Sequence, residues 1–366
     1  MLGHKRIPSR EGGVEIVVEE LATRLVNKGY EVDVYNRKGN NVSDKNIKTK
    51  KIKKYKGVNI KTVFTINKKG IDALIYSFLA SIRVAFGKYD CIHYHAEGSC
   101  AMIWIPHFMK KRTVVTIHGL DWQRAKWGGF AIKYIKFGEK CAAKYADEII
   151  VLSKNVQKYF KDTYNRDTVF IENGVNKSVL KSADIITEKY GLNGDDYILY
   201  LARIVPEKRL DLLIEAFKKT NTNKKLVIAG GASHTNDFMQ KIEELAKQDE
   251  RIIMTGFVQG EELEELFSNA YLYCLPSDVE GMPISLMEAM SYGRNCLISD
   301  IEENVQVCGE YGMTFKKSDL DDLTNKLNLC LNGKSRFEEK AISNYILEKY
   351  NWDNVVKKTE KLYKSI

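Results

Sequence analysis

Short apolar stretches alternate with amphipathic stretches along almost the whole chain. The apolar stretches are rich in Val, Ile and Tyr, which is typical of buried strands, and they lie at residues 32–35, 91–94, 113–117, 149–152, 169–172, 198–202, 226–229, 252–255, 272–275 and 296–299. The amphipathic stretches repeat apolar positions at helical spacing and include residues 15–27, 71–86, 130–146, 210–219, 237–247, 284–291 and 352–366. Strand followed by helix, repeated, predicts an α/β protein with parallel sheets covered on both faces.

The alternation weakens between residues 173 and 196, where the sequence is NGVNKSVLKSADIITEKYGLNGDD. Turn-forming residues are frequent in this segment, so we predict that it links two domains. A chain of 366 residues is also too long for one ordinary core. We therefore expect open α/β domains at 1–175 and 176–348 that face each other across a cleft, with a final helix at 349–366 that crosses back to the first domain.

The composition is that of a globular protein, with 44% hydrophobic and 29% charged residues. No apolar run is long enough to span a membrane, and none at the start resembles a secretory signal, so we expect a cytoplasmic protein. The cysteines fit neither a metal site nor a disulfide framework, and most are predicted to be buried thiols: Cys91, Cys100, Cys141, Cys274, Cys296, Cys308 and Cys330.

Positive charge is concentrated in the first part of the chain. Residues 1–150 contain 28 Lys and Arg against 14 Asp and Glu, a net charge of +14, although the whole chain carries only +9. Such a surface suits an anionic partner, either a phosphorylated substrate or a membrane face; the alternative is a solvated surface with excess lysine. The lysines at 50, 51, 53, 54 and 56 cluster, and Trp104, Phe108, Trp122 and Trp127 follow them, which favours peripheral association with the inner face of the cell membrane.

A first candidate site lies in LYLARIVPEKRLDLLIEAF. Arg203 and Lys208 follow a strand that ends at Ala202, and Pro206 and Glu207 are predicted to form the first turn of the next helix. Two cations beside a helix N-terminus can bind a diphosphate. The alternative is a pair of solvated cations.

A second candidate site lies in LPSDVEGMPISLMEAMSYG, where a strand precedes a loop and a helix that starts near Pro283. Glu280 is predicted to lie in the loop and Glu288 in the second helical turn, so that both can face one cleft. Carboxylates accept hydrogen bonds from sugar hydroxyls, and free helical amides can bind phosphate. The alternative is that both glutamates are ordinary surface charges.

Five motifs together resemble the retaining glycosyltransferases of family 4: EGGVEIVVEELATRLVNKGYEVDVY, TVVTIHG, IENGVN, LYLARIVPEKRLDLLIEAF and EGMPISLMEAMSYG. The similarity covers nearly the whole chain, and the spacing of Glu280 and Glu288 matches the E-x7-E signature of that family. It implies the GT-B fold, with two Rossmann-like domains, of which the first takes the acceptor and the second takes the nucleotide sugar. The opening motif further resembles the branch that builds bacterial capsule, exopolysaccharide or O-antigen.

The resemblance also implies roles for individual residues. Arg203 and Lys208 would bind the donor diphosphate, and Glu288 would bind the ribose. The donor sugar would contact Glu280 and the amides of Gly281 and Met282. The remaining positions are Gly256, Phe257 and Val258 at the base, His118 at the reacting carbon, and Gly12 and Gly13 at the diphosphate.

The family pattern includes a strand before the Gly12-Gly13 loop, but the only apolar run before that loop here is Met1-Leu2. The resemblance therefore implies a first strand that is cut short. Gly12 and Gly13 allow the backbone to approach a phosphate closely, and they lie at the N-terminus of a predicted helix. The alternative is an ordinary turn.

Other motifs are rejected as sites. Gly333-Lys334-Ser335 lacks the earlier glycine of a phosphate loop, because position 328 is Asn. Asp319-Leu320-Asp321 is interpreted as helix capping and not as a metal site. His93 and His95 are taken to face different sides of a strand, which argues against a metal there, although His95 or Glu97 could line the acceptor cleft.

The resulting expectation is transfer of a hexosyl group from a nucleotide diphosphate sugar to a hydroxyl of a glycan or a lipid-diphosphate-linked sugar, without a metal or other cofactor. The alternative within the same fold is a nucleotide-sugar epimerase. Nucleic-acid binding would explain the charge, but no binding module is recognisable and the acidic residues of the expected cleft would repel phosphate backbones.

Overall fold

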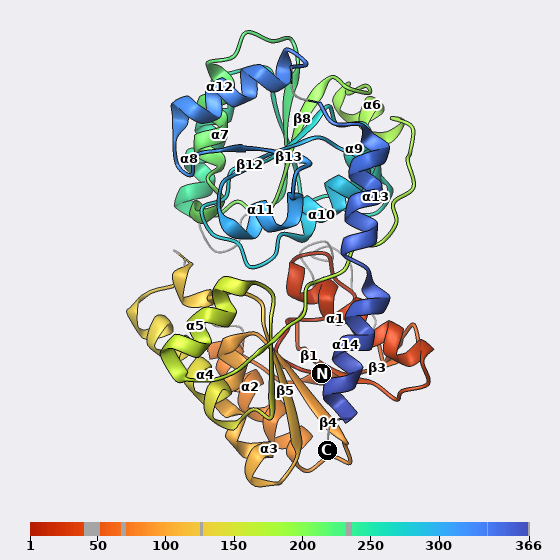
Figure 1. Cartoon of the computed structure of the whole chain (residues 1–366), viewed down its shortest axis with the longest axis vertical. Coiled ribbons are helices and arrows are strands. Elements are labelled where there is room, and N and C mark those ends of the chain that lie inside the picture. The colour runs from red at the N-terminus through yellow and green to blue at the C-terminus, as the bar shows by residue number, and fades with distance from the viewer. Residues whose placement is uncertain (40–51, 67–70, 125–126, 232–235, 335, 365–366) are drawn as a thin grey trace. The chain divides into compact units, whose positions relative to one another are not determined.

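The structure, a computed structural model, describes residues 1–39, 52–66, 71–124, 127–231, 236–334 and 336–364. The chain forms two compact units (Figure 1). Unit 1 comprises Met1–Gly174 and Trp352–Ile366, and unit 2 comprises Val175–Asn351. The last helix of the chain therefore packs with the first unit.

Unit 1 is an α/β unit built on seven named strands in its described part: β1 (Asp33–Arg37), β2 (Lys54–Tyr55), β3 (Val58–Val63), β4 (Cys91–His95), β5 (Arg112–Ile117), β6 (Glu148–Val151) and β7 (Val169–Phe170). Its helices are α1 (Gly13–Asn27), α2 (Ile71–Ala85), α3 (Trp104–Phe108), α4 (Gly129–Tyr145), α5 (Lys154–Tyr164) and α14 (Trp352–Lys364), with 3-10 turns η2 (Glu97–Met102) and η3 (Asp121–Gln123). All pairings are parallel except the β2–β3 hairpin.

The first two residues occupy the central position of this sheet. The strands form two groups, β1-β3-β2 and β4-β5-β6-β7. Met1 O accepts a hydrogen bond of 2.9 Å from Tyr35 N of β1, and Leu2 forms a parallel bridge with Tyr94 of β4. Leu2 is fully buried. The two groups are therefore halves of one sheet joined by Met1 and Leu2.

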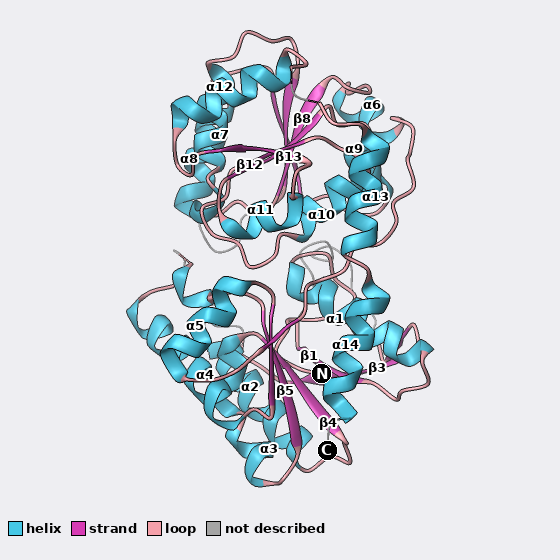
Figure 2. Ribbon diagram, in the orientation of Figure 1, coloured by secondary structure: helices cyan, strands magenta, loops and turns pink. Residues whose placement is uncertain are grey.

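Helices cover both faces of the unit 1 sheet (Figure 2). On one face, residues of α2, α4 and α5, such as Tyr76, Ala142 and Phe160, pack with Tyr94 and Val115. On the other face, α1 and α14 provide Leu21, Val356 and Tyr363, which pack with Val34 and Val114. Strands with two covered faces explain the nearly continuous apolar runs in the sequence.

Unit 2 contains one parallel sheet whose strands are β8 (Tyr197–Leu201), β9 (Lys225–Ala229), β10 (Ile252–Gly256), β11 (Leu272–Leu275), β12 (Cys296–Ser299) and β13 (Gly312–Phe315). Its helices are α6 (Ile185–Tyr190), α7 (Leu210–Lys218), α8 (Asn236–Ala246), α9 (Glu261–Ser268), α10 (Ile284–Ser291), α11 (Glu302–Cys308), α12 (Leu320–Leu331) and α13 (Glu339–Lys349), with a 3-10 turn η4 (Pro206–Lys208). The strand order is β10-β9-β8-β11-β12-β13. This is the doubly wound order of a Rossmann fold, so the predicted architecture is confirmed.

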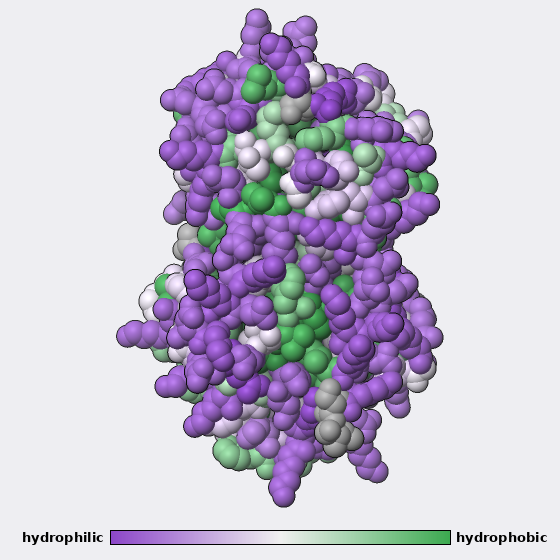
Figure 3. All heavy atoms as spheres, in the orientation of Figure 1, coloured by the Kyte–Doolittle hydropathy of each residue, from purple (hydrophilic) through white to green (hydrophobic). Residues whose placement is uncertain are grey.

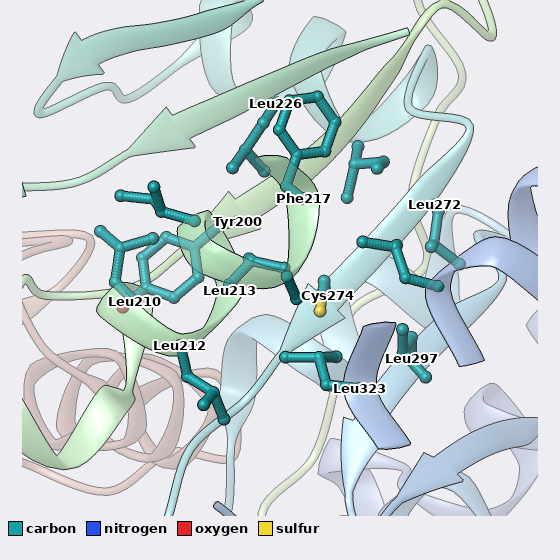
Figure 4. Packing of buried hydrophobic residues seen from close by; sticks show 14 of the residues in the cluster. Tyr200, Leu210, Leu212, Leu213, Phe217, Leu226, Leu272, Cys274, Leu297 and Leu323 are labelled. Carbon is teal, nitrogen blue, oxygen red and sulfur yellow. The ribbon is translucent and has the colours of Figure 1, made fainter. Parts of the chain in front are cut away.

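The core of unit 2 lies between its sheet and helices α7, α8 and α12. Figure 4 shows Tyr200, Leu213 and Phe217 packed with Leu226 and Leu272, and these side chains are almost fully buried. Burial of a side chain of this size contributes about 1.5–3 kcal/mol. The core fixes β8 and β11 side by side, which positions the loops that follow them.

The ten predicted strands all coincide with observed strands, and β2, β3 and β13 are additional. The cysteines are free thiols, and all except the half-buried Cys91 are buried, as expected. Among the described residues, no helix has the length and apolar character needed to cross a bilayer. The surface visible in Figure 3 is mostly hydrophilic on both units.

Candidate active site

The two strongest sequence motifs fall on the loops that flank the switch point of the unit 2 sheet. The chain runs from β8 to β9 and β10 in one direction, and from β11 to β12 and β13 in the other. Strands β8 and β11 are neighbours, so the loops after them leave the same edge of the sheet in opposite directions. Ligands of doubly wound sheets bind at this point, beyond the carboxyl ends of the strands.

The loop after β8 differs from the prediction in its local geometry. Pro206–Lys208 forms a separate 3-10 turn, and α7 begins only at Leu210. The break lies at Arg209, whose φ of 51° is left-handed and cannot continue a right-handed helix. Arg209 Nη1 donates to Asp278 Oδ2 at 2.9 Å. The break therefore directs Arg209 toward the loop after β11, and Pro206 and Glu207 are not part of α7.

The switch-point loops are joined by a charged pair and by backbone. Lys208 Nζ donates to Glu280 Oε1, with side-chain exposures of 15% and 8%. Asp278 N donates to Glu207 O at 2.9 Å. Two charges this poorly hydrated need each other, since either alone would lose its hydration without compensation. The structure thus brings together Lys208 and Glu280, which sequence analysis assigned from separate motifs.

Helix α10 carries the rest of the second motif. Pro283 is its N-cap residue, and among the described residues no side chain caps it. The amides of a first turn without a side-chain cap can bind an anion. Gly281 and Met282 lie directly before this N-terminus, and Glu288 lies in its second turn, half-buried. Ser285 of the first turn bonds Tyr273 OH at 2.8 Å, which fixes α10 to β11.

The predicted base-binding segment, Gly256 to Val258, is connected to the β8 loop through the turn after β9. Gly230 N donates to Gly256 O at 2.8 Å, and Ile204 N donates to Gly231 O at 3.1 Å. Gly256 has a φ of 74°, and Val258 is buried while Phe257 is half-buried. These hydrogen bonds connect the carboxyl ends of β8, β9 and β10 to one another, beside the half-buried Arg203.

In unit 1, Gly12 is the N-cap of α1 and Gly13 is its first residue. A Cβ atom at Gly12 would lie 2.5 Å from Glu15 Oε2, and Glu15 Oε1 accepts a hydrogen bond of 2.9 Å from Lys5 N. The start of α1 therefore already has a carboxylate next to it. Glu15 was not among the residues predicted from the sequence, although an acidic residue in a first turn is a usual partner of a helix N-terminus.

His118 follows β5 and belongs to a row of buried histidines. Its Nε2 lies 3.1 Å from His95 Nδ1, and the two rings are stacked. His95 in turn stacks on His93 with ring centroids 4.2 Å apart. The prediction that His93 and His95 face different sides is therefore wrong, because residues two apart on a strand share a face.

Burial keeps this row neutral. It lowers the pKa of His118 to about 4 and the pKa values of His93 and His95 well below the ordinary value of 6.5. His93 Nδ1 bonds the OH of Tyr363 from α14 at 2.6 Å, and His93 Nε2 bonds Thr116 Oγ1 at 2.7 Å. His118 at neutral pH is consequently an uncharged hydrogen-bonding group.

Glu97, the other residue considered for the acceptor side, lies at the start of η2 and is fully buried. Its Oε2 accepts a hydrogen bond of 2.9 Å from Asp121 N, and its Oε1 has no partner among the described residues. Burial, with the nearby Asp121 and Glu139 charges, raises the pKa of Glu97 well above its usual range. Glu97 therefore holds its proton to higher pH than an exposed glutamate.

In the described part of the chain, no group of three or more His, Cys, Asp or Glu side chains could hold a metal ion. Asp319, the first residue of the rejected D-x-D motif, is the N-cap of α12 and accepts a hydrogen bond of 3.0 Å from Asp322 N. Its predicted capping role is confirmed.

Two family sequence models match the two halves of the chain. Residues 11–179 match the model described as Glycosyltransferase Family 4, and residues 182–346 match the model described as Glycosyl transferases group 1. The boundary between the matches falls close to the boundary between the units.

Individual relatives agree with these matches. The chain is 26% identical to an uncharacterized glycosyltransferase of Methanocaldococcus jannaschii, over 98% of this chain and 95% of the relative. It is 25% identical to a UDP-Gal:alpha-D-GlcNAc-diphosphoundecaprenol alpha-1,3-galactosyltransferase of Escherichia coli, over 75% and 74% of the two chains. The solved structure of sucrose-phosphate synthase from Thermosynechococcus elongatus superposes with a TM-score of 0.81 at 20% identity, covering 96% of this chain and 93% of that one.

The fold is GT-B, with two Rossmann-like units of mixed α/β content. The chain is a glycosyltransferase of the group 1 type.

The hydrogen bonds that join Arg209, Asp278 and Ser318 were not predicted from the sequence; in this group, Ser318 Oγ donates to Asp278 Oδ1 at 2.8 Å. No sequence signal marks Arg209, because a left-handed arginine has no characteristic pattern. The histidine row was not predicted either, although its signal was present in the spacing of His93 and His95.

Proposed function

We propose that the chain is a retaining, metal-independent family 4 enzyme that transfers a hexosyl group from a nucleotide diphosphate sugar to a hydroxyl acceptor. The supporting observation is the Lys208–Glu280 pair between the loops that flank the switch point. Residues from two separate motifs meet there, next to an uncapped helix N-terminus. This combination of cation, carboxylate and amides suits a sugar diphosphate.

The leaving group is a nucleoside diphosphate, on which negative charge develops as the glycosidic bond breaks. Arg203, Lys208 and the first amides of α10 offset this charge. When the diphosphate binds, Lys208 exchanges Glu280 for phosphate oxygens, and Glu280 becomes free to accept hydrogen bonds from the sugar together with the amides of Gly281 and Met282. Glu288 binds the ribose, and Gly256 to Val258 contact the base.

The acceptor side belongs to unit 1. His118 hydrogen-bonds the sugar at the reacting carbon and, because it is neutral, adds no charge there. Gly12 and Gly13 bring backbone close to the diphosphate. The acceptor is a glycan or a lipid-diphosphate-linked sugar, as the name of the Escherichia coli relative indicates for that enzyme. The cellular role is assembly of a bacterial surface polysaccharide (capsule, exopolysaccharide or O-antigen), by a cytoplasmic protein held peripherally at the inner face of the membrane.

The first experiment is a thermal-shift panel of UDP-, GDP- and dTDP-sugars, followed by transfer assays with the best binder in the presence of EDTA. Arg203→Ala, Lys208→Ala and Glu280→Ala should each lower the transfer rate by roughly ten-fold to a thousand-fold, the scale of one lost charge-stabilising contact. Lys219→Ala, which removes an exposed lysine just after α7, is the matched control.

Undiminished transfer by all three site variants would refute the site assignment. Loss of activity in EDTA, restored by a divalent metal, would refute metal independence. The epimerase alternative predicts a converted nucleotide sugar in the absence of any acceptor, so product analysis of that reaction distinguishes the two enzymes.

A further inference from the structure

Exposed hydrophobic side chains are distributed unequally between the two units. Among the described residues, twelve large hydrophobic side chains are exposed in unit 1 and four in unit 2. All of the exposed aromatic ones lie in unit 1: Phe64, Phe78, Phe86, Trp104, Phe108, Phe130 and Phe137. Six of these seven lie on or directly after α2, α3 and α4. An uneven concentration of this kind marks an interaction surface.

Helix α4 shows the chemistry of this surface most clearly. Its buried residues are Ile135, Gly138, Glu139, Cys141 and Ala142, which fixes the opposite side as the outer one. The exposed residues after its first position are Phe130, Lys133, Lys136, Phe137, Lys140 and Lys144. Phe130 and Phe137 are 82% and 51% exposed. The only acidic residue of the helix, Glu139, is fully buried, so the outer face carries phenylalanine and lysine without a compensating charge.

Helices α2 and α3 extend the surface. Ile71, Leu74 and Phe78 are exposed at the spacing of one helical stripe of α2. Trp104 and Phe108 of α3 are exposed and in edge contact, and Phe108 also lies 5.9 Å from the ring of Tyr145 at the end of α4. In Figure 1, α2, α3 and α4 lie together on one side of β4 and β5. The only acidic residue of α2, Asp72, is paired with Arg37.

We propose that the outer face of α2, α3 and α4 binds the surface of an anionic lipid bilayer. Aromatic rings beside lysines suit the boundary between headgroups and acyl chains, where rings enter the apolar layer and ammonium groups meet lipid phosphates. A neutral protein partner would leave the lysines of α4 without complementary charge. The proposal deepens the proposed function, on which it rests for the location of the acceptor, by assigning the membrane contact to one surface and one lipid class.

This surface coincides only in part with the one expected from the sequence. Lys50 and Lys51 lie outside the described residues, and Lys53, Lys54 and Lys56 are exposed on and beside β2, whereas Trp122 and Trp127 are half-buried. Trp122 donates its Nε1 hydrogen to buried Glu139 at 3.2 Å, and Lys136 lies over its ring. Of the aromatic residues first considered, Trp104 and Phe108 remain on the proposed surface.

The test is vesicle co-sedimentation of the full chain at low salt, with vesicles of phosphatidylglycerol and phosphatidylcholine compared with phosphatidylcholine alone. Binding should require phosphatidylglycerol and fall steeply in half-molar salt. Lys133→Gln, Lys140→Gln and Lys144→Gln together should weaken binding by roughly a hundred-fold, at about five-fold for each lysine. Phe130→Ser with Phe137→Ser should weaken it by at least about ten-fold.

A matched control places the same changes on unit 2: Lys317→Gln, Lys334→Gln and Lys340→Gln, or Val179→Ser with Leu180→Ser, all at exposed positions. These variants should bind vesicles like the wild type. Equal losses in the α4 and control variants, or no loss in either, would overturn the proposal.

Analytical ultracentrifugation tests the alternative that this surface binds a second copy of the chain. The membrane proposal would be overturned if the wild type were a dimer that Phe130→Ser with Phe137→Ser converts to a monomer, and if neither the wild type nor any variant bound vesicles. Transfer to a soluble acceptor should be unchanged in the α4 variants. If vesicle binding behaves as expected but no donor is ever consumed, the proposed function fails while the membrane surface stands.

Discussion

At the scale of single residues, the contact between His95 and His118 decides which nitrogen of His118 can serve the substrate. Since both rings are buried and neutral, one of the facing nitrogens carries the shared proton and the other accepts it. His118 Nε2 is thereby engaged, and Nδ1 is the nitrogen left for a sugar hydroxyl. His95 would then be a positioning residue that sets the tautomer and orientation of His118.

Two substitutions of His95 separate this role from simple packing. The amide of Asn places polar atoms near the position of Nδ1, whereas the amide of Gln reaches toward that of Nε2. His95→Asn should keep most of the transfer rate, and His95→Gln should lower kcat by about ten-fold to a hundred-fold, part of the usual contribution of an oriented acid or base. The KM for the donor should stay unchanged in both, as measured by initial-rate kinetics.

The melting temperature of each variant provides the control. If Asn and Gln lower kcat equally and in proportion to lost stability, His95 is only a core residue. The sequence identified His93 and His95, and their spacing of two residues on one strand already indicates that they share a face. The contact of His95 with His118 depends in addition on the pairing of β4 with β5, which the sequence pattern does not show.

At the scale of elements, the turn after β9 holds the donor-side loops against each other. Gly230 has a φ of 150°, and a Cβ atom there would lie 1.9 Å from Ala202 O, in the loop that carries Arg203. Gly230→Ala must push this backbone away and strain its own. We expect a loss of at least about 2 kcal/mol in the free energy of unfolding, together with weaker donor binding, as measured by denaturant titration and by the ligand-induced thermal shift.

Gly231→Ala is the matched control one residue further along. Among the described residues other than its chain neighbours, no atom lies within 4 Å of a Cβ placed at Gly231. This variant should keep both the stability and the donor affinity of the wild type. If Gly230→Ala behaves like Gly231→Ala, the turn does not constrain the β8 loop in the way that we describe.

Most of the strands that the sequence predicts are buried along their length, which produces continuous apolar runs, although the predicted edge strands β7 and β10 are half-buried throughout. The strands that it misses lie at or next to sheet edges. β13 is an edge strand with a half-exposed pattern, and β2 and β3 follow one another within the lysine-rich segment KKYKGVNIKTV. Their residues alternate with charges that are equally compatible with a loop. Where lysines are interspersed with the apolar residues, as in β2 and β3, the pattern is therefore too weak for prediction.

The sequence pattern predicts which loops carry the candidate site residues, but it does not predict which of these residues contact one another. Arg203, Lys208 and Glu280 could be placed in loops because they follow strongly apolar strands, and the family resemblance implied their roles. That β8 and β11 are neighbours depends on the strand order of the whole sheet, and the pairing of Lys208 with Glu280 depends on it in turn. The bond from Asp278 N to Glu207 O involves backbone alone, so side-chain identity carries no information about it.

At the scale of the whole molecule, the two units should differ in their response to acid. Four buried histidines lie in unit 1. Burial lowers the pKa of His4 to about 3 and that of His118 to about 4, and it lowers the pKa values of His93 and His95 well below 6.5. The unfolded chain takes up these protons as the pH falls through about 6.5, whereas the folded unit does not. The stability they contribute is therefore complete above pH 6.5 and is lost below it.

Each such histidine lowers the free energy of unfolding by on the order of 1 kcal/mol for each pH unit below about pH 6. Glu97 acts in the opposite direction because burial raises its pKa, but one carboxyl does not offset four imidazoles.

All four tryptophans of the chain, Trp104, Trp122, Trp127 and Trp352, belong to unit 1, so their fluorescence monitors the unfolding of this unit alone. The urea midpoint measured in this way should fall clearly between pH 7 and pH 5. His4→Gln should flatten the dependence, and an equal midpoint at both pH values would mean that the histidines are not buried as neutral groups.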